Sequence, residues 1–173
     1  GNNTIYYLLR NAIRNAKNFI YVEDQYFINE SDMGIGPSIF RLLADKVKQD
    51  NFKALVIFTT NVSGINIEMF QTWARRKKFR SLFTDESFKK VSICTYRAGV
   101  TDAYLHSKTW IFDDEFAIVG SANCNRRGYS HDSEVGIGIA DLWSPGVVQS
   151  LRIDLWYKHI NAYYPATSKI VEK

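Results

Sequence analysis

The run from Lys53 to Thr60, KALVIFTT, constrains the fold most, because it is apolar at almost every position. A strand with one exposed face alternates apolar and polar residues, whereas a strand covered on both faces does not. The run is also shorter than most helices. It therefore predicts a buried strand in a sheet that carries helices on both faces.

Helix-like and strand-like segments alternate along the first half of the chain, and strands cluster in the second half. Helices are expected over residues 4–18, 37–50, 67–83 and 146–160, and strands over residues 19–28, 53–60, 91–96, 104–112, 115–121 and 134–140. This order predicts an α/β fold with one mixed sheet between two layers of helices. No linker interrupts it, so residues 1–173 are expected to form a single domain.

Composition narrows the classes of protein. The chain is 46% hydrophobic with a net charge of +4, which is typical of a globular protein and tolerates an anionic partner without requiring one. Its two cysteines have no metal-ligand spacing, so zinc is not expected. The chain begins with glycine and enters a helical pattern almost at once. We interpret it as a piece of a longer protein, with a processed short protein as the alternative.

A polar cluster follows from the spacing in the second half. His106 and Lys108 are two residues apart on an expected strand, so their side chains point to one face, while Ser107 and Thr109 point to the other. A turn at Asp113 then leads into a return strand that ends at Gly120. The hairpin is expected to bring together the polar side chains on that face and the carboxylate that opens the next strand: His106, Lys108, Ser121, Asn123 and Glu134.

These residue types suit phosphoryl chemistry. Histidine can act as nucleophile, acid or base near neutral pH, and a carboxylate can fix its tautomer. A lysine and an amide suit the non-bridging oxygens of a phosphate. The residues alone therefore predict phosphoryl-group chemistry without a metal.

The full pattern is His106-x-Lys108-x4-Asp113, then Gly120-Ser121-x-Asn123 and HDSEVGIGI. It resembles the HKD signature of the phospholipase D superfamily. The stretches FIYVEDQYFI and LRIDLWYKHI are similar to flanking segments of the second half of two-lobed phospholipases D. The resemblance implies that this chain forms one phospholipase D/nuclease-type α/β/α layer, and that two such layers pack together so that two HKD motifs face each other.

It also implies a mechanism that needs no metal or cofactor. One histidine attacks phosphorus and forms phosphohistidine, and the other protonates the leaving alcohol and then activates water or an acceptor alcohol. By resemblance, His106 is the catalytic histidine and Glu134 orients it. The remaining implied roles are phosphate binding for Lys108, Ser121 and Asn123, and a motif position for Asp113 that is catalytic or structural. The resemblance also places Glu23, Asp24 and Gln25 near the pocket rim, with a plain strand-ending turn as the alternative. Arg126 follows the GSAN segment directly and is a candidate for anion contact at that rim.

Only one HKD motif is present, so an active site needs a partner. We expect the chain to be the second half of a two-lobed enzyme that acts on phospholipid, with His106 as general acid. Peripheral contact with a membrane is compatible with this expectation. One alternative is a homodimeric nuclease, although we favour phospholipid over nucleic acid as the substrate. The other is an isolated half that binds phosphate without turnover. We interpret the basic run Arg75–Arg80 as a solvated helix face or as a contact for anionic lipid or nucleic acid. His131 is expected in an exposed loop and His159 near a helix end.

Overall fold

The computed structural model describes residues 3–29, 31–32, 34–60, 67–95, 97–98, 101–102, 104–141 and 146–163. Its elements, in chain order, are α1 (Thr4–Asn15), β1 (Phe19–Asp24), α2 (Ile39–Val47), β2 (Ala54–Thr59), α3 (Ile67–Arg80), α4 (Asp85–Phe88), β3 (Val91–Thr95), β4 (Arg97–Ala98), β5 (Thr101–Asp102), β6 (Lys108–Phe112), β7 (Phe116–Gly120), α5 (Arg126–Ser130), β8 (Gly136–Ala140) and α6 (Val147–Tyr163).

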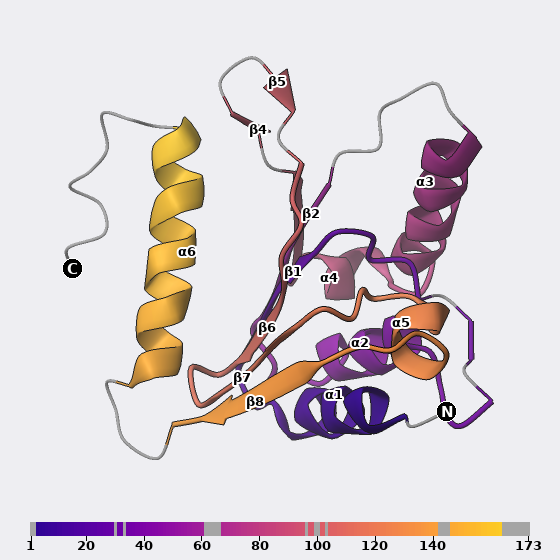
Figure 1. Ribbon diagram of the computed structural model, residues 1–173, viewed down its shortest axis with the longest axis horizontal. Coiled ribbons are helices and arrows are strands. Elements are labelled where there is room, and N and C mark those ends of the chain that lie inside the picture. The colour runs from indigo at the N-terminus through magenta and orange to yellow at the C-terminus, as the bar shows by residue number, and fades with distance from the viewer. Residues whose placement is uncertain are drawn as a thin grey trace.

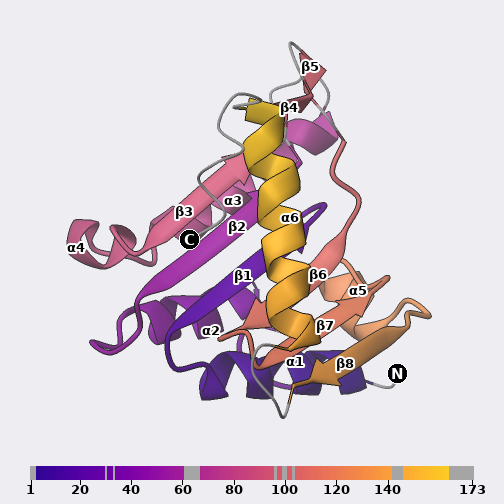
Figure 2. The same cartoon turned by 90° about the vertical axis from the view of Figure 1, so that its left-hand side faces the viewer.

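The main sheet has the strand order β3-β2-β1-β6-β7-β8. β1 pairs in parallel with β2, and β2 with β3, while β6, β7 and β8 pair antiparallel. Helix α6 covers one face of this sheet, and α1 to α5 lie on the other side (Figure 1). Turned by a right angle, the molecule shows α6 crossing in front of the central strands (Figure 2). The expected mixed sheet with helices on both faces is confirmed.

Strand alternation sorts the core into two layers. Ile20, Val22 and Trp110 contribute to the large layer under α1 and α2, whereas Tyr21 and Ile111 face α6. On α6, the residues that pack against this second layer recur at helical spacing: Val148, Leu151, Leu155 and Trp156. Among the described helices, none is long and apolar enough to cross a bilayer.

Two strands are markedly shorter than the sequence predicts. β1 ends at Asp24, because the carboxylate of Asp24 accepts the N–H groups of Tyr26 and Phe27, and Phe27 has a φ of 44°. β6 begins only at Lys108, so His106 lies in the extended segment before the strand. β3 ends at Thr95, and Tyr96, which we expected in that strand, lies outside the described residues.

Asp113 holds the connection between α1 and β1. It follows β6 with a φ of 55°, and its carboxylate accepts the N–H groups of Lys17 (2.5 Å), Asn18 (2.7 Å) and Phe19 (2.8 Å). The strand length puts it roughly 20 Å along the chain from His106, at about 3.3 Å per residue. The structure thus separates Asp113 from the other motif residues, because the length of β6 lies between them.

Replacing Asp113 with Asn tests this structural role. Asparagine tolerates a positive φ but keeps only one acceptor oxygen, so at least one backbone N–H loses its partner. We expect the free energy of unfolding to fall by about 1–3 kcal/mol in urea denaturation. Glu115→Gln, in the exposed position two residues on, is the matched control and should leave stability near the wild-type value. Equal stability of the two variants would contradict the role.

Candidate active site

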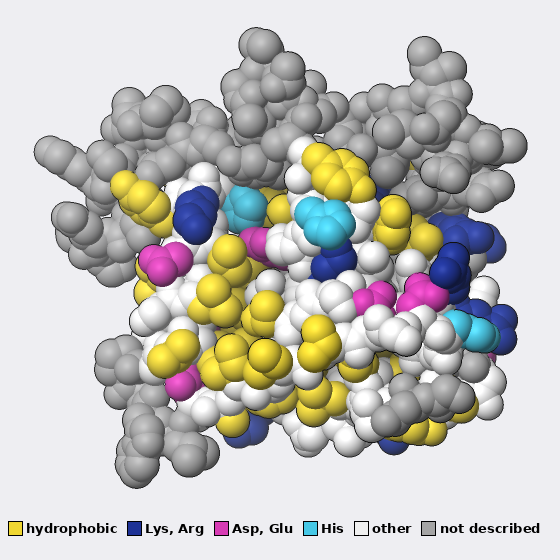
Figure 3. Space-filling view, viewed as in Figure 1, with side chains coloured by type: hydrophobic (Ala, Val, Ile, Leu, Met, Phe, Trp, Pro, Cys, Tyr) yellow, Lys and Arg dark blue, Asp and Glu magenta, His cyan; other side chains and the backbone are white. Residues whose placement is uncertain are grey.

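The predicted cluster assembles at one end of the central strands. Lys108 opens β6, Ser121 and Asn123 follow β7, and Glu134 precedes β8. In the space-filling view, histidine, basic and acidic side chains adjoin one another near the middle of this face (Figure 3). The hairpin of β6 and β7 therefore brings the HxK and GSxN segments to one end of the sheet, as the spacing predicts.

Lys108 is the most enclosed member of the cluster. Its side chain is only 7% exposed, and its Nζ donates to Oε1 of Gln25 (3.0 Å) and to the carbonyl of His106 (2.6 Å). Burial lowers the pKa of this ammonium group, while Asp24 and Glu134 act in the opposite direction. An ammonium group with few solvent contacts is suited to a strong interaction with an anion.

His106 is exposed, in contrast to Lys108. Its ring stacks on that of Tyr104, with centroids 6.0 Å apart and 25° between the planes. Tyr104 is itself 66% exposed, and its hydroxyl accepts a hydrogen bond from Nε2 of Gln25. The imidazole is therefore held against an aromatic ring while remaining accessible to solvent.

The turn after β7 is fixed by backbone contacts. A Cβ on Gly120 would lie 2.3 Å from the carbonyl oxygen of Val135, so this position requires glycine. The hydroxyl of Ser121 donates to the carboxylate of Glu134 and accepts the N–H of Val135 at 3.0 Å. The amide oxygen of Asn123 is buried and has no hydrogen-bond partner among the described residues.

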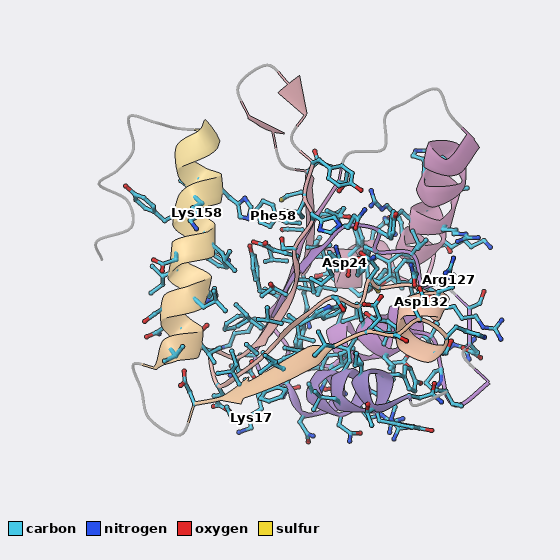
Figure 4. All side chains as sticks on the ribbon, viewed as in Figure 1. Lys17, Asp24, Phe58, Arg127, Asp132 and Lys158 are labelled. Carbon is cyan, nitrogen blue, oxygen red and sulfur yellow. The ribbon has the colours of Figure 1, made fainter. Side chains whose placement is uncertain are left out.

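Glu23, Asp24 and Gln25 lie beneath the site rather than at its rim. They are 2%, 0% and 4% exposed, so the expectation of rim positions is corrected. Glu23 and Asp24, the last two residues of β1, point to opposite faces of the sheet, as strand geometry requires, and Gln25 follows the end of the strand. Asp24 lies on the side of α1 and α2, whereas Phe58, next to Glu23 in the sheet register, points toward α6 (Figure 4).

Each of these three residues holds a different part of the site. Glu23 accepts a hydrogen bond from Ser107, between the two motif residues, and Gln25 bonds Lys108. Asp24 accepts the N–H of Cys124 at 2.8 Å, directly after Asn123. Burial raises the pKa of Asp24 to about 6, against the opposing effects of its backbone hydrogen bonds and Lys108.

Arg76 supports the site, although in the sequence it stands within a general basic run. Its guanidinium donates to the carbonyls of Tyr26 (2.7 Å) and Thr60 (2.7 Å) and, at 3.3 Å, of Gln25. Burial lowers its pKa to about 10, with Asp24 opposing the shift. Arg76 thus ties α3 to the turn after β1, while Arg75, Lys77 and Lys78 are exposed. In the sequence nothing distinguishes it from its basic neighbours.

His159 has a structural role that differs from our expectation. We expected an ordinary helix-terminus residue, but its side chain is buried, bonds Glu23 at 2.7 Å and stacks on Phe58 at 4.1 Å. A signal existed, since His159 continues the i, i+4 series of Leu151 and Leu155 on the buried face of α6.

A polar cleft of about 640 Å³ adjoins the cluster. Its lining includes Ser121, Glu134 and the loop residue His131, which is exposed as expected. Arg126 is exposed at the start of α5 and does not line this cleft. Within the described ranges, no group of three or more His, Cys, Asp or Glu side chains is arranged to hold a metal ion.

Comparison with known proteins assigns the family. The family model described as "Cardiolipin synthase, PLD-like domain" matches residues 9–154. The chain belongs to this phospholipase D-like family. Curated relatives include phospholipase D alpha 1 of Zea mays, which is 25% identical over 218 aligned residues covering 87% of this chain and 27% of the maize protein. Phospholipase D zeta 1 of Arabidopsis thaliana is 24% identical, with 98% and 20% covered. The chain thus spans about a quarter of the length of such relatives.

Solved structures confirm the phospholipase D-like fold. Nuc from Salmonella typhimurium, a phospholipase D family member, superposes with a TM-score of 0.63 at 17% identity, covering 91% of this chain and 87% of Nuc. Phosphatidylserine synthase from Haemophilus influenzae gives a TM-score of 0.62 at 16% identity, covering 91% of this chain and 36% of that one.

The raised pKa of Asp24 predicts a pH dependence of stability. A carboxyl group with a raised folded-state pKa contributes stability that is fully present below about pH 4 and is lost as the pH rises through about 6. At about 1.4 kcal/mol per pKa unit, the loss is about 3 kcal/mol. Urea unfolding from pH 4 to pH 7 should show this decline in the wild type and not in Asp24→Asn, which cannot titrate.

The control for this series is Asp45→Asn, an exposed position on α2. Its stability curve should run parallel to the wild-type curve. A parallel curve for Asp24→Asn as well would show that Asp24 is not the group that titrates.

Proposed function

We propose that this chain supplies one of the two HKD motifs of a metal-independent phosphodiesterase or phosphatidyltransferase that acts on phospholipids through a phosphohistidine. The observation that carries the proposal is the enclosed Lys108 ammonium group, which donates to the backbone carbonyl of the exposed His106 at the end of the sheet where Ser121 and Asn123 also lie. This arrangement joins a titratable group to a phosphate-binding surface in a member of the phospholipase D-like family.

The proposed reaction has two displacements at phosphorus. In the first, one imidazole nitrogen forms a bond to phosphorus, the bond to the leaving alcohol breaks, and the second imidazolium gives that alcohol its proton. In the second, the now neutral second imidazole removes a proton from water or an acceptor alcohol, which attacks phosphorus and releases the first histidine. Lys108 and the Asn123 amide group would stabilise the non-bridging oxygens in both steps.

His106 needs a second histidine from outside this chain's motif. His131 and His159 are not followed by lysine at the second position, and His159 is buried. We therefore propose that residues 1–173 act as the second HKD lobe of a two-lobed protein, with His106 as general acid. Glu134 would orient its ring, and the partner lobe would bring the other histidine to its exposed side.

A homodimeric nuclease is the second candidate. One observation favours it: the fold of this chain matches 87% of Nuc, so a single unit of this kind makes up most of one phospholipase D family member. In this arrangement two copies of His106 would face each other, and either could be the nucleophile.

Substitution of His106 tests the proposed chemistry. On the protein as it is naturally produced, His106→Ala should lower kcat for a chromogenic phosphodiester by at least ~10²–10⁴, the usual contribution of general acid–base catalysis. A chelator should leave the wild-type rate unchanged. Lys89→Ala, at an exposed lysine of the distant α4 region, is the control and should retain full activity. Comparable rates for His106→Ala and the control would overturn the proposal.

The dependence of specific activity on chain concentration distinguishes the homodimer from the two-lobed enzyme. For the chain 1–173 by itself, a specific activity that rises with concentration and vanishes in His106→Ala supports a site built from two copies. No turnover at any concentration, with activity in the longer protein, supports the two-lobed enzyme. Phosphatidylcholine vesicles and single-stranded DNA, offered in parallel, distinguish the substrate classes.

A further inference from the structure

A buried polar network lies on the face of the sheet opposite Lys108. Its centre is the carboxylate of Glu23 on β1, which accepts hydrogen bonds from the hydroxyl of Tyr21 (2.5 Å), Nε2 of His159 (2.7 Å) and the hydroxyl of Ser107. The reaction proposed above uses none of these groups. Their enclosure raises the question of what this network stabilises.

Burial of the Glu23 carboxylate would cost free energy if its hydrogen-bond donors were absent. An unpaired buried carboxylate is strongly destabilising, so each donor is needed to offset desolvation. Burial by itself raises the pKa of Glu23, but the hydrogen bonds from His159, Ser107 and Tyr21 outweigh burial, and the pKa lies below its usual value. Glu23 is therefore an ionised acceptor with fixed geometry.

Ser107 connects this network to the site. It stands between His106 and Lys108, in a segment that precedes β6 and has no strand pairing of its own among the described residues. Side chains hold that segment instead: Thr60 donates to the carbonyl of Leu105 at 2.9 Å, and Lys108 to that of His106. The Ser107 hydroxyl is the contact that reaches across to the α6 face.

We propose that Glu23 and His159 are positioning residues that fix the catalytic segment through Ser107. Helix α6 contributes His159, whose ring is stacked on Phe58 and so has a defined orientation. The orientation of His159 sets that of the Glu23 carboxylate, which in turn holds the backbone on both sides of Ser107. The C-terminal helix is thereby coupled to His106 without touching substrate. This inference rests on the proposed function for its kinetic consequences, though not for its geometry.

The test removes single hydroxyl groups. Ser107→Ala deletes only the donor to Glu23, whereas Ser107→Thr retains a hydroxyl. Thr109→Val is the matched control, because Thr109 lies two residues on, buried on the same face of β6. In the naturally produced protein, Ser107→Ala should lower kcat about 10–100-fold with little change in KM, since a displacement of about 1 Å has an effect of this size. Ser107→Thr should restore most of the rate, and Thr109→Val should match the wild type.

A second readout does not depend on turnover. The chain has three histidines, so the imidazole resonances of His106 can be assigned with His106→Ala. Ser107→Ala and Glu23→Gln should shift or broaden these resonances, and Thr109→Val should not. Glu23→Gln is isosteric, and Ser107→Ala keeps the result interpretable if Glu23→Gln fails to fold.

The two readouts keep the two proposals distinguishable. Wild-type kcat and unchanged His106 resonances in Ser107→Ala would overturn the positioning role, even if His106→Ala is inactive. An active His106→Ala would refute the proposed function instead. In that case the resonances alone decide the positioning role, which stands if they move in Ser107→Ala and falls if they do not.

Discussion

The candidate site depends on three consecutive buried polar residues at the end of β1. Glu23 holds the segment between His106 and Lys108, Asp24 holds the backbone after Asn123, and Gln25 holds Lys108 itself. Because β1 is central in the sheet, these contacts are made on a rigid element. These contacts hold two pieces of the motif, the segment of His106 and Lys108 and the segment after Asn123.

Alternation along β1 explains how two adjacent residues hold parts of the site from opposite faces of the sheet. Successive side chains of β1 point to opposite faces, so Glu23 reaches the α6 side while Asp24 reaches the side of α1 and α2. Ser107 and Lys108 likewise point to opposite faces of the sheet, and Ser107 bonds Glu23 whereas Lys108 bonds Gln25. Glu23 and Ser107 thus meet on the α6 face, Asp24 lies on the face of α1 and α2, and Arg76 of α3 donates hydrogen bonds to the turn that follows β1.

Local patterns predicted much of this arrangement. The apolar run of β2, the amphipathic helices and the hairpin after His106 are each determined by neighbours in the chain, and the layered fold follows from them. The cluster of Lys108, Ser121 and Glu134 was likewise predictable, because strand period and hairpin pairing place those residues from sequence spacing alone.

Contacts between distant segments could not be predicted from local patterns. Asp113 is a motif residue, but its oxygens are taken by the N–H groups of Lys17 to Phe19, nearly a hundred positions earlier. Glu23 and His159 are separated by most of the chain, and their pairing depends on how α6 crosses the sheet. Tertiary packing decided these roles, including the difference between Arg76 and its exposed basic neighbours.

The most direct measurement is titration of the protein with inorganic phosphate, followed through the imidazole resonances of His106, in the wild type and in Gln25→Glu. The substitution is nearly isosteric and places a carboxylate against the Lys108 ammonium group, whose charge the site would otherwise offer to phosphate. The account predicts saturable shifts of the His106 resonances in the wild type and at least about tenfold weaker binding in the variant. Equal affinities, or no response of His106 to phosphate in the wild type, would contradict it.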